Sequence, residues 1–146
     1  GMGGTTIILS KKNKLFHIIC TNGSGSFNKY KNKETLIRNR KKESEKSNKF
    51  MNIDKFFYYG LDNVSTNKNA NIFVYEVWGA FNKYHHYVNI DKVIKKKNKI
   101  INFHKSQVYY KDYALGITGI NHYHAVFNNF GKEKDQYVEV FIENII

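Results

Sequence analysis

The chain has 146 residues, of which 41% are hydrophobic and 16% aromatic, and its formal net charge is +12 at pH 7. This length suits one domain with a sizeable core, and the apolar content excludes a wholly disordered chain. The single cysteine, Cys20, excludes a disulfide framework and a cysteine-based zinc site. No apolar run approaches the roughly 20 residues of a transmembrane helix, so we expect a soluble protein, with no compartment indicated.

The first half of the chain predicts strands around a polar segment. Residues 1–4 resemble the remnant of a cleaved expression tag and are expected to form a disordered end. The β-branched and aromatic runs at 5–10 and 15–21 predict a hairpin, and those at 53–59 and 72–78 predict two more strands. The intervening residues 28–49 are polar and charged, and we expect them to form a basic loop or an exposed helix.

The second half continues the same pattern. Residues 88–95 suit a strand or a short helix, and 97–99 suit a turn. Another strand is expected at 108–113, and 120–127 with 137–145 predict a closing hairpin. We therefore predict one globular domain over residues 1–146, of the α+β class but β-rich. It would have about seven to nine strands, mostly in antiparallel hairpins, and one or two short helices.

The positive charge is confined to two segments. Residues 28–49 hold nine Lys and Arg against three Glu, residues 92–105 hold six Lys and no acid, and the other residues balance at nine against nine. An AT-rich genome would favour Lys and Asn, but it would spread them more evenly. We therefore predict a surface for RNA or another polyanion, contacted through phosphates because almost all the cations are Lys. The residues expected to form it are Lys29, Lys31, Lys33, Arg38, Arg40, Lys41, Lys42, Lys92, Lys95, Lys96, Lys97, Lys99 and Lys105.

Three histidines are candidates for catalysis. His122 and His124 would share one face of a predicted strand, and His104 lies in the second basic segment. Imidazoles titrate near neutral pH, so such a set could act as general acid and base in a small, toxin-like, metal-independent ribonuclease. Two ordinary histidines on a half-exposed strand would produce the same pattern. No third ligand follows with zinc spacing, so we predict neither a metal nor a cofactor for this function.

Several segments resemble the heat-labile enterotoxin and cholera-toxin class of mono-ADP-ribosyltransferases. Lys14-Leu15-Phe16-His17 is similar to the first strand of that family, and Val64-Ser65-Thr66-Asn67 is similar to its Ser-Thr-Ser strand. Residues 73–77 with 88–93, and 114–117 with 120–126, resemble later parts. Where the family has its catalytic Glu-x-Glu pair, shortly before Ala114, this chain has Tyr109-Tyr110-Lys111.

The resemblance implies a degenerate enzyme or pseudoenzyme with NAD as its cofactor. His17, Ser65, Thr66 and Tyr75 would then lie near the dinucleotide, His17 in place of the family's Arg. A third hypothesis is a structural or inhibitory module that binds another protein through its aromatic strands. The sequence leaves these alternatives open beside the polyanion surface.

Overall fold

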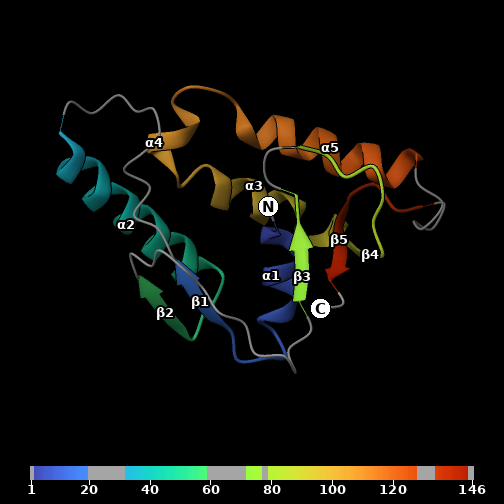
Figure 1. Cartoon of the computed structure of the whole chain (residues 1–146), viewed down its shortest axis with the longest axis horizontal. Helices are drawn as coiled ribbons and strands as arrows, with labels where there is room; N and C mark the ends of the chain where they lie inside the picture. Colours follow the sequence, from blue (N-terminus) through green and yellow to red (C-terminus); the bar gives the residue numbers. More distant parts are fainter. Residues whose placement is uncertain (1, 20–31, 59–71, 77–78, 128–133, 145–146) are drawn as a thin grey trace.

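The computed structural model describes residues 2–19, 32–58, 72–76, 79–127 and 134–144, arranged as in Figure 1. In chain order the elements are α1 (Gly3–Leu9), β1 (Phe16–Ile19), α2 (Lys33–Phe50), β2 (Lys55–Tyr58), β3 (Ile72–Tyr75), β4 (His86–Asn89), a 3-10 turn η1 (Asp91–Val93), α3 (Ile94–Ile101), α4 (Lys105–Val108), α5 (Tyr113–Phe127) and β5 (Val138–Asn144). The prediction of a β-rich domain with seven to nine strands is wrong. The described residues form an α+β fold with five α-helices and five strands.

The strands form two separate small sheets. β1 and β2 pair in parallel, with Phe16 opposite Lys55. In the other sheet β5 lies between β3 and β4 and is antiparallel to both, with Phe141 opposite both Tyr75 and His86. The two predicted hairpins are therefore wrong, because β1 and β5 both pair with strands that are distant in the sequence.

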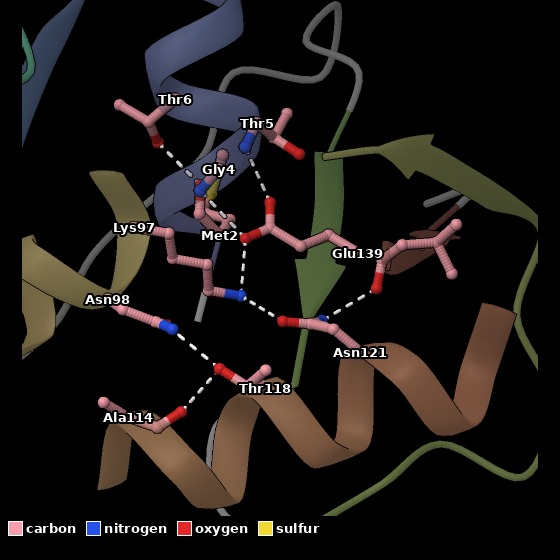
Figure 2. A network of polar contacts seen from close by, with 11 residues as sticks. Met2, Gly4, Thr5, Thr6, Lys97, Asn98, Ala114, Thr118, Asn121 and Glu139 are labelled. Atoms are coloured by element: carbon pink, nitrogen blue, oxygen red, sulfur yellow. Dashed lines mark hydrogen bonds and ion pairs between the residues drawn. The ribbon is translucent and has the colours of Figure 1, made fainter. Parts of the chain in front are cut away.

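Helix α1 occupies the run that predicted the first strand. The Glu139 carboxylate accepts hydrogen bonds from the backbone N–H groups of Gly4 (2.9 Å) and Thr5 (2.7 Å), as Figure 2 shows. Such groups at a helix N-terminus have no partner within the helix, and a negative charge is favourable there. This contact outweighs the strand preference of the β-branched run. It also places Gly3 and Gly4 in a helix, in contrast to the disordered end expected for residues 1–4, of which Gly1 lies outside the described residues.

Helix α5 replaces the strand predicted at 120–127, and the strand predicted at 108–113 is also wrong, because those residues connect the end of α4 to the start of α5. The Asp112 carboxylate accepts a hydrogen bond from the Leu115 N–H at 2.9 Å and so caps the start of the helix. The buried residues Ala114, Asn121 and His124 are seven and three positions apart, which places them on one face of a helix. The capping aspartate and this spacing outweigh the aromatic and β-branched content.

The described parts of the two basic segments are largely helical. Of the two states predicted for residues 28–49, a basic loop or an exposed helix, α2 corresponds to the helix. The Asn32 side chain caps its N-terminus. The turn predicted at 97–99 is wrong, because Val93, Lys97 and Ile100 point inward at the spacing of a helix.

A hydrophobic core joins these helices. Its buried residues are Ile7, Met51, Ile90, Val93 and Ile100. In Figure 1, α1 and α3 lie between the β1–β2 sheet with α2 at one end and the β3–β5–β4 sheet with α5 at the other. In the described ranges, none of the helices combines the length and the apolar character that a bilayer span requires.

Candidate functional site

Two phenylalanines bring the basic helices together. The rings of Phe50, at the end of α2, and Phe103, just after α3, lie edge to face with centroids 5.4 Å apart. Lys46 Nζ of α2 lies 4.6 Å from the centre of the Phe103 ring, and Lys99 Nζ of α3 lies 5.1 Å from that of Phe50. Cations from segments about 50 residues apart in sequence therefore flank one aromatic pair.

Helix geometry extends this arrangement along both helices. Lys42 and Lys49 share the face of α2 that carries Lys46, and Lys95 and Lys96 flank Lys99 at helical spacing on α3. All of these side chains are exposed. We call this surface the cationic junction: Lys42, Lys46, Lys49, Lys95, Lys96 and Lys99.

The other predicted polyanion contacts differ in position. Lys33, Arg38, Lys41, Lys92 and Lys105 are exposed, and Arg40 is half-buried. Lys29 and Lys31 lie outside the described residues. The exposed side chains remain available to a large anion, and the junction is where cations of both segments meet.

Lys97 does not belong to this surface, which corrects its prediction as a polyanion contact. Its side chain is 2% exposed, and its Nζ lies 2.8 Å from Glu139 Oε1 and donates to Asn121 Oδ1 at 2.6 Å. Asn121 in turn donates to the Val138 carbonyl at 2.7 Å. Figure 2 shows this closed cluster of Lys97, Glu139 and Asn121 joining α1, α3, α5 and β5. Burial lowers the pKa of Lys97, and attraction to Glu139 opposes that shift.

A groove of about 630 Å³ opens beside the junction. Its walls come from α1, β1, the inner side of α2 and the end of α3, and they include His17, Ser47, Asn48 and His104. A volume of this size is typical of small-molecule sites.

Two hydrogen bonds join these four polar side chains in two pairs, and we call the four residues the open cluster. His17 Nδ1 lies 2.6 Å from Asn48 Oδ1, and because an amide oxygen only accepts, the proton is on Nδ1. His104 Nε2 lies 3.0 Å from Ser47 Oγ, whose own proton goes to the Glu43 carbonyl. His104 is therefore the donor to Ser47, so this arrangement does not activate the serine as a nucleophile.

Charges around the open cluster affect His104. Burial lowers its pKa, the Glu43 carboxylate raises it, and Arg40 and His17 lower it further. Glu43 also accepts hydrogen bonds from the Ser106 N–H (2.7 Å) and hydroxyl (2.6 Å), which hold α4 against α2. Burial, the largest of these effects, therefore favours the neutral form of His104.

The three predicted catalytic histidines do not meet. His122 and His124 lie on α5, where residues two apart point about 200° away from each other. His124 is buried with its Nε2 2.8 Å from Glu76 Oε1, whereas His122 is exposed and bonded to the Gln136 carbonyl. Only His104 lines the groove. The prediction that they share a face is wrong because it assumed a strand.

The residues that the family resemblance implied are partly brought together. His17 and Tyr75 both line the groove, and Ser65 and Thr66 lie outside the described residues. Ser47 and Asn48 were not among the predicted site residues. A signal existed for Ser47, because the helical spacing of Leu36, 40, 43, 47 and Met51 places it on the inward face of the helix.

Comparisons with protein-family models, with curated proteins and with solved structures find no match to this chain. Within the described ranges, His, Cys, Asp and Glu side chains nowhere gather in a group of three or more that could hold a metal ion. The case for a function therefore depends on the cationic junction and the groove.

Proposed function

We propose that the protein binds RNA or another polyanion through the cationic junction. The observation that carries this proposal is the pairing of Lys46 with Phe103 and of Lys99 with Phe50, on rings that touch each other. It supports a single electropositive surface built from both basic segments. Phosphate groups are the matching partner, because Lys supplies point charge without the forked geometry that reads bases.

The mode of binding follows from these side chains. The two rings already contact ammonium groups and are half-buried, so contacts to phosphates and not base stacking would dominate. We expect binding that depends little on sequence and weakens steeply with salt, because each phosphate contact releases condensed counterions.

The test is fluorescence anisotropy of a labelled single-stranded RNA over a range of salt concentrations. Changing Lys42, Lys46, Lys95 and Lys99 together to Gln should reduce the slope of log K against log salt by up to about 3, at roughly 0.7 per lost contact. A matched control changes four exposed lysines outside the junction to Gln: Lys11, Lys12, Lys83 and Lys134. Both variants lose four positive charges, so their RNA affinities will differ only if binding is localised at the cationic junction.

Three outcomes would count against the proposal: equal losses in the two variants, no dependence on salt, or no binding at low salt below about millimolar RNA. Equal affinity for heparin and RNA would support the cationic junction as a binding surface and would show that it binds polyanions in general. Gel analysis of the RNA after each titration tests whether the metal-independent cleavage predicted from the sequence accompanies binding.

A second candidate function is dinucleotide binding of the mono-ADP-ribosyltransferase type. The observation that favours it is that His17 and Tyr75, which the resemblance implies lie near NAD, line the same groove. Calorimetric titration with NAD tests binding, and an assay of NAD hydrolysis tests turnover. An absence of heat and of turnover at millimolar NAD would remove it.

A further inference from the structure

Helix α5 presents an uncharged apolar face to solvent. Its 15 residues, Tyr113–Phe127, include no Lys, Arg, Asp or Glu. Its buried side packs against α3 and β5, and in Figure 1 the helix lies along the upper edge of the molecule. On the other side, four large apolar side chains are between 55% and 71% exposed: Leu115, Tyr123, Val126 and Phe127. A contiguous apolar surface of this kind often marks an interaction site, because covering it removes apolar area from water.

Three of these side chains lie in one row that also contains a gap. The row consists of residues four positions apart, which follow one ridge of the helix: Leu115, Gly119, Tyr123 and Phe127. At its C-terminal end the rings of Tyr123 and Phe127 contact each other, with centroids 5.0 Å apart. Gly119 leaves a gap, because a Cβ there would meet no described atom within 4 Å. The ridge is therefore high in its second half and has a depression in its first half.

This order of residues is complementary to itself when a second α5 runs in the opposite direction. Around a twofold axis level with residue 121, Tyr123 of each copy lies opposite Gly119 of the other, and Phe127 lies opposite Leu115. Contact between such ridges is the commonest class of helix packing, and a twofold interface uses the same surface on both copies. A parallel pair would place Tyr123 opposite Tyr123 and would leave the gap at Gly119 empty.

Charge and area both favour a second copy of this chain as the occupant. Two copies that each carry a net charge of +12 repel each other, and a face without charged side chains is where this repulsion opposes contact least. At about 200 Å² for a whole large side chain, the exposed parts of the four side chains offer roughly 500 Å² per copy, or about 1,000 Å² for a pair, which is the lower limit for a specific interface. The face is therefore large enough for a weak dimer.

We propose that α5 is a homodimer interface, in which two copies of the chain pack their α5 helices antiparallel across Gly119. Leu115 also lines a hollow of about 500 Å³ beside α5, so the Phe127 ring of the second copy has space to enter there. The small area predicts an affinity in the micromolar range. The interface contains none of the lysines of the cationic junction and does not depend on polyanion binding.

Sedimentation velocity of the whole chain, from low to high micromolar concentration and at several salt concentrations, provides the test. We expect a monomer–dimer equilibrium that shifts toward the dimer as salt rises, because salt screens the repulsion between the two copies. RNA binding at the cationic junction should weaken over the same range, so the failure of one proposal is distinguishable from the failure of the other. A chain that stays monomeric at high micromolar concentration, or dimers that dissociate as salt rises, would overturn the homodimer.

Two variants locate the contact. Gly119→Glu and Asn13→Glu each lower the net positive charge by one, and Asn13 is an exposed residue just after α1. Gly119→Glu should fold, because its Cβ meets no described atom within 4 Å and Glu is a better helix former than Gly. It should weaken dimerisation by at least about tenfold, because it fills the gap and brings two like charges together, whereas Asn13→Glu should leave dimerisation within about twofold of the parent chain. Equal dimerisation of the two variants would place the contact elsewhere and refute the α5 interface.

An exchange of large and small side chains tests how the two helices are aligned. Gly119→Tyr should weaken dimerisation by at least about fivefold because it overpacks the contact, and Tyr123→Ala should do so because it leaves the gap empty. The double variant Gly119→Tyr with Tyr123→Ala again sets one large side chain opposite one small one, so it should dimerise better than either single variant. A double variant that dimerised no better than the single ones would overturn the pairing of residues 119 and 123.

Discussion

The closed cluster around Lys97 and the open cluster around Asn48 are built from similar groups, but they differ in how completely those groups are paired. Lys97, Glu139 and Asn121 each have protein partners at 2.6–2.9 Å. Asn48 is nearly as buried as Lys97 and is one of the residues that line the groove, yet its Nδ2 has no hydrogen-bond partner in the described chain. A completed network holds helices in place, whereas an incomplete one beside a cavity offers binding energy to a ligand.

The same contrast appears within helix α3. Lys95, Lys96 and Lys99 project into solvent, and Lys97 points inward between Val93 and Ile100. Equal charges in adjacent positions therefore have different roles, which the period of the helix determines. The net charge therefore overstates the positive charge of the surface, because a buried and paired lysine such as Lys97 contributes nothing to it.

The largest expected effect is on the closed cluster. Lys97→Met should lower the free energy of unfolding by about 3–5 kcal/mol, because it leaves the buried Glu139 carboxylate without its counter-charge. Urea denaturation followed by circular dichroism measures the change. The matched control is Lys96→Met, an exposed neighbour, which should stay within about 0.5 kcal/mol of the parent chain.

The double variant Lys97→Met with Glu139→Gln sharpens this comparison. Removing both charges should restore part of the lost stability, since no uncompensated ion remains. If Lys97→Met and Lys96→Met were equally stable, the closed cluster would not be a structural network.

A smaller effect is expected where α1 meets the closed cluster. A Cβ on Gly4 would lie 2.8 Å from Ile90 Cγ2 and 3.1 Å from Glu139 Oε1. Gly4→Ala should therefore destabilise the protein by about 1–3 kcal/mol, the usual range for overpacking a core. Urea denaturation again measures the change, as a lower midpoint with no change in the dependence of the unfolding free energy on urea concentration.

The preceding glycine is the control for this prediction. A Cβ on Gly3 would meet only Lys97 Cγ, at an ordinary contact distance of 3.6 Å. Gly3→Ala should be neutral or slightly stabilising, since Ala is the better helix former. Equal destabilisation by both substitutions would contradict the close approach of α1 to Ile90 and Glu139.

Some of the fold could be predicted from local sequence. β2 and β3 fall inside the aromatic runs at 53–59 and 72–78, and part of α2 follows from its charged, Glu-containing stretch. The strand predicted at 5–10 was wrong, because α1 depends on a carboxylate 134 residues away in the chain. Propensity describes only neighbours in sequence, and here a distant contact outweighed it.

The candidate site was predictable in the same partial way. The sequence identified the two basic segments. It did not predict that Phe50 and Phe103 bring them into contact, or that Lys97 is buried in an ion pair with Glu139. His104 was predicted with His122 and His124, and it lies instead with Ser47 and His17. The error in the element type of 120–127 produced the error in the histidines, since strands and helices present different spacings on one face.

The smallest effect is expected in the open cluster and depends on pH. Burial lowers the pKa of His104 in the folded chain, so between its ordinary value near 6.5 and the lower folded value the unfolded chain binds more protons. Stability from this residue is therefore fully present above about pH 6.5 and is lost as the pH falls through that window. His104→Gln keeps an N–H that can donate to Ser47 and does not titrate. Urea denaturation should show a smaller loss of stability between pH 7.5 and 5.5 in this variant than in the parent chain, and parallel profiles from pH 7.5 to 8.5. A parent chain whose loss on acidification matched that of the variant would mean that His104 is protonated equally in both states, and the wall of the groove would then be open to water at this point.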